Sequence, residues 1–195
     1  LISQSIAKAI TPKTRVVLLN SPNNPSGAVY SPGTLTAILE LCREREIWVI
    51  SDEVYSEIAP EGFTPIASLP GSHEQTVTIS SLSKSHRMTG WRCGWMVGPE
   101  KLTRHLTKLN MCMTYGLPPF IQDASVTALE KDQDTAKKVK TRLDSNRMIL
   151  RELGSIEGAK SFAQGGGMFA ILEKRHFGLS SREFCWKLLD QRGVS

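Results

Sequence analysis

Three short apolar runs stand out in the first half of the chain. They span residues 15–20, 47–52 and 76–81. Each is apolar at consecutive positions and ends in polar residues, a pattern that predicts strands buried on both faces of a mostly parallel sheet. Between the first two runs, Ser31 and Pro32 provide a helix N-cap and a proline at the first helical position, and apolar residues continue at helical spacing to about Glu46. This order predicts a right-handed crossover unit.

Further helices and a fourth strand are predicted around these runs. The helices span residues 3–10, 99–113, 118–129 and 135–153. The strand spans residues 92–97. Alternating strands and helices indicate an α/β fold, and we expect a three-layer α/β/α domain with a mostly parallel sheet over residues 1–153.

The pattern changes after Gly154. This last part of the chain contains a glycine turn at 165–167, an apolar run at 168–172 and a helix over 180–191. We interpret residues 154–195 as the beginning of a small α+β domain. Because residue 1 already lies in a helical pattern and the chain ends in a short apolar segment, we expect a fragment of a longer protein.

The composition narrows the class of protein. Of 195 residues, 40% are hydrophobic and 22% are charged, which is ordinary for a soluble globular protein. The net charge of +5 is spread along the chain, and the basic stretch 137–151 is interpreted as a solvated helix face rather than a nucleic-acid site. No run reaches the roughly 18 apolar residues of a membrane span.

The cysteines are widely separated in the sequence. They are Cys42, Cys93, Cys112 and Cys185, and no two of them form a C-x-x-C pair. We therefore expect neither a metal site nor a disulfide framework, but free buried thiols in a reducing cytoplasm.

Polar side chains follow each apolar run at its carboxyl end. They are Asn24 after the first run, Asp52 and Tyr55 after the second, and Ser81, Ser83 and Lys84 after the third. Ligands of open α/β sheets bind beyond the carboxyl ends of the strands, where the connecting loops converge. An amide, a carboxylate with a phenol, and a lysine flanked by hydroxyls are therefore expected at one rim.

Each of these residues has a structural and a chemical interpretation. Most lysines are solvated, yet Lys84 directly follows a buried run, where desolvation lowers the pKa of an amine and makes it a nucleophile toward aldehydes. Asp52 taken alone is a helix cap or turn residue, but beside a pyridine ring a buried aspartate keeps the ring nitrogen protonated. Arg92 is either a surface strand residue or a ligand for a phosphate dianion.

The motifs together resemble those of class I and II aminotransferases, which depend on pyridoxal 5'-phosphate (PLP) and have fold type I. The similar segments are Asn23–Gly27, Asp52–Tyr55 and Ser81–Lys84, followed by Arg92. The likeness extends over essentially the whole chain. It implies an enzyme that moves an amino group from an amino acid to a 2-oxo acid in a ping-pong cycle.

The resemblance also implies a role for each matching residue. Lys84 would hold PLP as a Schiff base and later carry a proton between the substrate Cα and the cofactor C4′. Asp52 would pair with the ring nitrogen. Tyr55 and Asn24 would hydrogen-bond the phenolic oxygen of the ring, and Asn24 would also contact the substrate carboxylate. The phosphate ligands would be Ser81, Ser83 and Arg92.

Other parts of the family pattern bear on assembly and specificity. Residues 115–118 match a segment that approaches the neighbouring subunit's active site, which implies a homodimer. The family's phosphate-binding glycine loop, ring-stacking aromatic residue and substrate-binding arginine lie outside this sequence. Segments 83–92, 109–123 and 166–169 are most similar to bacterial transaminases that act on arginine and pyruvate, although no residue here independently selects arginine.

Two other functions remain open. The same fold and cofactor serve carbon–sulfur lyases and other eliminating enzymes, and they also form non-catalytic PLP-sensing domains of transcriptional regulators. His73 and His86 lie near Lys84 in the sequence, but a loop position and a surface position are the simpler interpretations. The triple glycine lacks the context of a phosphate-binding loop, and no metal-binding motif is present.

Overall fold

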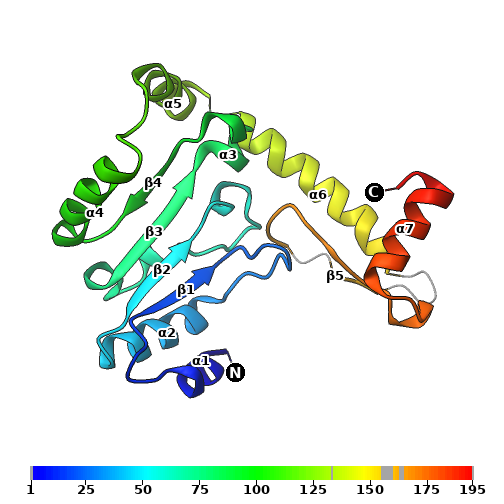
Figure 1. Ribbon diagram of the computed structural model, residues 1–195, viewed down its shortest axis with the longest axis horizontal. Coiled ribbons are helices and arrows are strands. Elements are labelled where there is room, and N and C mark those ends of the chain that lie inside the picture. The colour runs from blue at the N-terminus through cyan, green and yellow to red at the C-terminus, as the bar shows by residue number, and fades with distance from the viewer. Residues whose placement is uncertain (1, 133, 155–159, 163–164, 195) are drawn as a thin grey trace.

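The computed structural model describes residues 2–132, 134–154, 160–162 and 165–194. Within these residues, four strands form one sheet in the order β1, β2, β3, β4 (Figure 1). They are β1 (Val16–Asn20), β2 (Trp48–Asp52), β3 (Thr76–Ser81) and β4 (Gly94–Val97). The first three strands are parallel and β4 runs antiparallel to β3. The predicted α/β fold with a mostly parallel sheet is confirmed.

The fourth strand begins later than the sequence predicts. Residues Thr89–Trp91 form a 3₁₀ turn, η4, and Arg92 then takes a left-handed backbone conformation with φ of 54°. Pairing starts only at Gly94, opposite Ser81. Because a residue with positive φ does not fit the extended geometry of a strand, β4 starts two residues after the predicted position.

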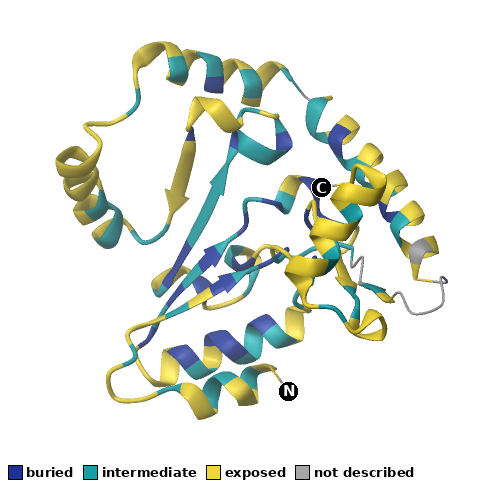
Figure 2. Ribbon diagram, turned by 45° about the vertical axis from the view of Figure 1, so that its right-hand side comes forward, coloured by how far each residue is buried: buried dark blue, intermediate teal, exposed yellow. Residues whose placement is uncertain are grey.

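Helix α2 (Pro32–Glu44) covers one face of the sheet. Ser31 is its N-cap and accepts a hydrogen bond from Thr34 N at 3.2 Å, as its sequence pattern predicts. The buried side chains of α2 are Leu35, Ile38, Leu39 and Cys42. They share one hydrophobic core with strand residues such as Leu19 and Val49 (Figure 2).

The opposite face of β1 is open among the described residues. Val17 and Leu19 pack into the core beneath α2, whereas the alternating Val16 and Leu18 are 44% and 68% exposed. Helix α1 (Ile2–Ala9) packs beside α2 and leaves this face uncovered. The described part of the chain thus supplies a helical layer on one side of β1.

Helix α6 (Thr135–Leu153) lies against the carboxyl end of the sheet. It contacts the short helix α3 (Leu82–Ser85), which follows β3, and the 3₁₀ turn η1 (Ser56–Ile58), which follows β2. Val139 of α6 is buried against Tyr55 in a second hydrophobic cluster. This helix therefore touches the segments that carry the predicted site residues.

Helices α4 (Glu100–Met113) and α5 (Pro119–Lys131) lie on the β4 side of the sheet (Figure 1). α4 has no buried residue. Large apolar side chains are exposed on both helices, namely Leu109, Met111, Met113, Phe120, Val126 and Leu129. Tyr115, between the helices, is 91% exposed.

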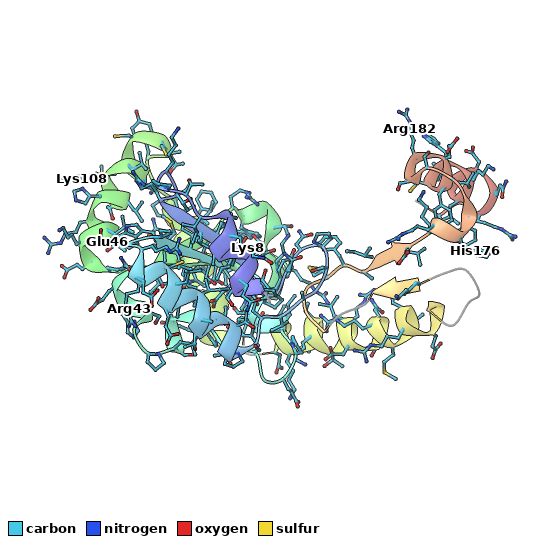
Figure 3. All side chains as sticks on the ribbon, turned by 90° about the horizontal axis from the view of Figure 1, so that it is seen from below. Lys8, Arg43, Glu46, Lys108, His176 and Arg182 are labelled. Atoms are coloured by element: carbon cyan, nitrogen blue, oxygen red, sulfur yellow. The ribbon has the colours of Figure 1, made fainter. Side chains whose placement is uncertain are left out.

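The last elements lie at the far end of α6, away from the four-stranded sheet (Figures 1 and 3). They are the antiparallel strands β5 (Lys160–Phe162) and β6 (Ile171–Glu173), the turn η5 (Arg175–Phe177) and helix α7 (Ser181–Arg192). A capping box between Ser180 and Glu183 starts α7. His176 and Arg182 belong to this part, well apart from the four-stranded sheet (Figure 3). The domain boundary after α6 stays a prediction.

Two expectations from the sequence are corrected by burial. Cys42 and Cys93 are buried as expected, but Cys112 and Cys185 are exposed. In the basic stretch on α6, Arg147 is only 8% exposed and does not belong to a solvated face. None of the described helices is long and apolar enough to cross a membrane.

Candidate active site

The carboxyl ends of the parallel strands meet at one rim, as the sequence predicts. Asn20 of β1 pairs in register with Asp52 of β2, and Asp52 lies opposite Ile79 of β3. The Asn20 side chain joins the first two strand ends, because its Nδ2 donates to the Asp52 carbonyl at 3.2 Å. The segments that leave these ends therefore start from fixed and neighbouring points.

The loop Asn23–Gly27 is braced by its own side chains. Asn23 Oδ1 accepts hydrogen bonds from Ser26 N at 3.2 Å and from Ser26 Oγ at 2.6 Å. The main-chain N–H of Asn24 donates to Asn20 Oδ1 at 2.8 Å. Hydrogen bonds therefore fix the backbone on both sides of Asn24.

The side chains of Asn24 and Tyr55 meet at the rim. Asn24 Nδ2 donates to Tyr55 Oη at 3.4 Å. Because the Tyr55 oxygen accepts here, its own proton can be donated to another group. Tyr55 is 2% exposed; burial raises the pKa of its hydroxyl, the Asn24 hydrogen bond lowers it by less, and the charge of Asp52 raises it further. Tyr55 is therefore a neutral donor at physiological pH.

Lys84 approaches the same tyrosine. Its Nζ lies 6.0 Å from the centre of the Tyr55 ring. Lys84 is carried by α3, a single helical turn that the sequence pattern does not predict. Ser81 is the N-cap of this turn and accepts a hydrogen bond from Ser83 N at 3.3 Å. The cap fixes the direction in which the chain, and Lys84 with it, leaves β3.

Asp52 is half-buried at the end of β2. Its Oδ1 accepts a hydrogen bond from Val54 N at 3.2 Å, which is the turn role expected of an isolated aspartate. Within the described part of the chain this is the only hydrogen bond to the carboxylate. The second oxygen is therefore available to a ligand.

A cavity of about 510 Å³ opens at this rim. Its wall includes Val54, Ser81, Ser83 and Arg92. Lys84 lines a neighbouring cavity of about 400 Å³ between α3 and α6, and Ser83 lines both. Neither cavity is lined by Asn24, Asp52 or Tyr55. The structure thus brings the predicted phosphate ligands to one cavity. The wall of this cavity also includes Val54, which in the sequence precedes Tyr55 and lies two residues after Asp52.

Arg92 and Ser81 line the same cavity because β4 pairs with β3. Gly94 pairs with Ser81, and a Cβ at Gly94 would come within 2.9 Å of Ser80 O, so a side chain does not fit. Arg92 lies two residues before Gly94. Its Nη1 donates to Thr89 O at 2.8 Å, which orients the guanidinium at the cavity wall.

Glu53 belongs to the surroundings of the site although its role is not evident from the sequence. It is 4% exposed, and its Oε1 accepts hydrogen bonds from Ile66 N and Ser51 Oγ, both at 2.9 Å. Burial raises the pKa of Glu53, these two hydrogen bonds lower it by less, and the charge of Asp52 raises it. Glu53 ties a distant turn to the end of β2 behind Asp52. The one signal in the sequence was a second acidic residue directly after Asp52.

The two histidines near Lys84 in the sequence take other positions. His86 Nδ1 hydrogen-bonds the hydroxyl of Ser85 at 2.8 Å. His73 is exposed in the 3₁₀ turn η3 (Ser72–Glu74) at the amino end of β3, opposite to the end that leads to Lys84. Neither histidine contacts the Asn24 and Tyr55 pair.

Residues 1–195 match the aminotransferase class I and II family over their whole length. The chain belongs to this family. The arginine–pyruvate transaminase AruH of Pseudomonas aeruginosa is 46% identical over 195 residues, which cover 99% of this chain and 50% of AruH. The aspartate aminotransferase of Rhizobium meliloti is 37% identical over 88% of this chain and 43% of its own length. This aminotransferase chain spans about half the length of the curated relatives it matches.

Solved structures of aminotransferases have the same fold. The aromatic aminotransferase of Pyrococcus horikoshii OT3 matches with a TM-score of 0.90 and 32% identity over 100% of this chain and 53% of that one. The N-succinyldiaminopimelate aminotransferase of Mycobacterium tuberculosis matches with a TM-score of 0.87 and 30% identity, over 100% and 52%. The names of these aminotransferases differ in substrate, so the likeness shows family and fold.

Proposed function

We propose that the protein containing this chain is an aminotransferase that holds PLP on Lys84 as a Schiff base and moves an amino group from an amino acid to a 2-oxo acid. The observation that carries the proposal is the cluster of Asn24, Tyr55 and Lys84 at the rim. Tyr55 supplies a buried phenol that accepts a hydrogen bond from the Asn24 amide, and the Lys84 amine lies 6.0 Å from the centre of its ring. These groups suit an aromatic aldehyde that bears a phenolic oxygen. Membership of the family supports the same conclusion.

The residues at the rim match the groups of the PLP ring. When bound, PLP supplies an electron sink for a carbanion at the substrate Cα. The second oxygen of Asp52 would hold the ring nitrogen protonated, and Tyr55 and Asn24 would donate to the phenolic oxygen. Tyr55 keeps its proton because burial raises its pKa. With PLP bound, Lys84 would hold the cofactor aldehyde, and its amine would carry the proton between the substrate Cα and the cofactor C4′.

The proposed phosphate ligands line the cavity of about 510 Å³. Ser81, Ser83 and Arg92 offer two hydroxyls and a guanidinium, a donor set suited to a dianion. The Ser81 oxygen accepts from Ser83 N and still has a proton to donate.

Arginine and pyruvate are the proposed substrates. The similar AruH is named as an arginine–pyruvate transaminase. Other similar proteins are named for aspartate and kynurenine, so family membership alone selects no substrate. Asn24 is proposed to contact the substrate carboxylate as well.

A homodimer is proposed because of the exposed surface around residues 115–118. Tyr115 is 91% exposed, and large apolar side chains of α4 and α5 are exposed on both sides of it. Large exposed apolar side chains in one segment of the chain are typical of a subunit interface. A cytoplasmic location also stays a prediction, which the four free cysteines fit.

The cofactor proposal is tested by borohydride reduction of the full-length protein loaded with PLP, followed by peptide mapping. Reduction converts the Schiff base into a stable secondary amine. The label is expected on Lys84 and is expected to disappear in Lys84→Ala. A label on any other lysine would refute the assignment.

The reaction is tested by following the absorbance of bound PLP with single amino acids. Arginine alone is expected to convert the bound cofactor to its pyridoxamine form, and pyruvate is expected to reverse the change. Release of ammonia together with a 2-oxo acid would instead show an eliminating enzyme. Binding of PLP with no half-reaction for any amino acid would exclude the aminotransferase and favour a sensor domain.

A further inference from the structure

Arg147 of α6 has a buried side chain that bonds to a distant part of the chain. Its Nη2 donates to Gly167 O at 2.6 Å, and its Nη1 donates to Asp144 Oδ1 at 2.5 Å. Lys140 donates to the other oxygen of Asp144 at 2.9 Å. A buried guanidinium is costly unless its N–H groups are bonded and its charge is paired. The bond to Gly167 and the pair with Asp144 supply both conditions.

The turn Gly165–Gly167 rests directly on the loop Asn23–Gly27. Gly166 N donates to Gly27 O at 2.9 Å. A Cβ at Gly166 would lie 2.4 Å from Pro22 Cβ and 2.9 Å from Gly27 O, so only glycine fits there. The two backbones are in contact without intervening side chains, and a displacement of the turn is transmitted to the loop.

The loop Asn23–Gly27 connects this contact to Asn24. Gly27 N donates to Asn23 O at 2.8 Å, so the loop closes at the residue that Gly166 contacts. From this loop the amide of Asn24 reaches Tyr55 Oη at 3.4 Å, which is at the long end for a hydrogen bond. A small displacement of the loop is enough to break the contact.

The same helix holds the other member of the pair. Val139 of α6 is buried against Tyr55. Helix α6 thus contacts the supports of both residues. Val139 packs against Tyr55, and Arg147 binds Gly167 in the turn that rests on the Asn24 loop. We propose that Arg147 is a positioning residue that sets the contact between Asn24 and Tyr55. The inference rests on the proposed function where these two residues are taken to bind the phenolic oxygen of PLP.

Three variants of the full-length protein separate this role from general stabilisation. Arg147→Met removes the donors and keeps a long apolar stem. Gly166→Ala disturbs the same contact from the other side without touching α6. Arg151→Met is the matched control, because Arg151 lies one turn further along α6 and is exposed.

The first readout is hydrogen–deuterium exchange of the cofactor-free protein. Exchange is expected to accelerate about tenfold in peptides that cover residues 20–29 and 165–170 in Arg147→Met and Gly166→Ala, because hydrogen bonds that close these segments are weakened. Arg151→Met is expected to exchange like the wild type. Equal exchange in Arg147→Met and Arg151→Met overturns the proposal.

The second readout is the pH midpoint of the absorbance change of bound PLP. Weaker donation from Asn24 and Tyr55 leaves the phenolic oxygen more basic, so the midpoint is expected to rise by about one pH unit in Arg147→Met and Gly166→Ala. Arg147→Lys, which keeps a charged donor, is expected to give an intermediate midpoint. If Arg147 only stabilises the fold, Arg147→Met lowers thermal stability and leaves the pH midpoint unchanged. That result overturns the proposal.

The two readouts keep the inference apart from the proposed function. If the wild-type protein binds no PLP, the proposed function fails, whereas the exchange experiment still decides whether Arg147 holds the loop. If Arg147→Met does not fold, Arg147→Lys and Gly166→Ala decide by the same two measurements.

Discussion

Asn24 donates its side-chain N–H to the hydroxyl of Tyr55 at 3.4 Å across 31 positions of the sequence. The first residue follows β1 and the second follows β2, which are neighbouring parallel strands in direct register. The contact leaves the Tyr55 O–H and the second N–H of Asn24 as donors at one point of the rim. Two donors from two strand ends thus converge where a single acceptor can bind both.

Tyr55→Phe is expected to weaken PLP binding about fivefold, since one hydrogen bond of about 1 kcal/mol is lost while the buried ring is retained. Fluorescence titration of the full-length protein with PLP measures this change. Tyr30→Phe is the control, because it removes the same hydroxyl from a side chain that packs against the core beneath α2 and has no proposed role in the site. Equal PLP affinities of the two variants would contradict a role of the Tyr55 hydroxyl.

Gly94→Ala is expected to lower the free energy of unfolding by about 1–3 kcal/mol, because the new Cβ overlaps backbone and cannot be relieved by a rotamer change. The overlap is with Ser80 O at 2.9 Å and Ser81 Cβ at 3.2 Å. Separation of β4 from β3 also moves Arg92, so PLP affinity is expected to fall. Gly90→Ala, with no atom within 4 Å, is the control for urea unfolding and PLP titration.

Glu53→Gln tests the raised pKa of a buried carboxyl group. Because the pKa of Glu53 in the folded protein lies above its ordinary value of 4.5, its contribution to stability is full below that pH and is lost as the pH rises through the folded pKa. Wild type is therefore expected to lose stability relative to Glu53→Gln as the pH rises above 4.5. Urea unfolding at several pH values measures the difference, and a constant difference would argue against the raised pKa.

Asp144→Asn tests the opposite shift. Burial raises the pKa of Asp144, but the hydrogen bonds and charges of Lys140 and Arg147 outweigh it and hold the pKa below 3.8. The contribution of this group to stability is present above pH 3.8 and is lost as the pH falls through the folded pKa.

The wild type is expected to lose stability relative to Asp144→Asn in acid, by less than about 1 kcal/mol because the Asp144 side chain is 46% exposed. Acid titration of the unfolding midpoint measures this difference. Asp134→Asn, whose pair with Lys138 is 3.9 Å long and exposed, is the control. A similar acid response in both variants would show that Asp144 is not specially stabilised.

Much of the fold was predictable because its signals are local. The three apolar runs became the parallel strands, since residues buried on both faces of a sheet must be apolar at consecutive positions. Ser31 caps α2 and Ser180 caps α7, because a hydroxyl before a helix satisfies N–H groups that the helix itself leaves open. The rim followed from the order of the strands, because the carboxyl ends of parallel strands share one edge.

The sequence by itself therefore determined the strands, the main helices and the set of polar residues gathered at the rim. Only the tertiary structure decided where β4 begins, that α3 forms, that Glu53 is buried, and that Arg147 bonds to Gly167 rather than to water. Each of these depends on atoms far away in the sequence, such as the Ser80 carbonyl against Gly94 or the Gly27 carbonyl against Gly166. Burial and hydrogen-bond partners of this kind are properties of the packed chain, and no local pattern of residues encodes them.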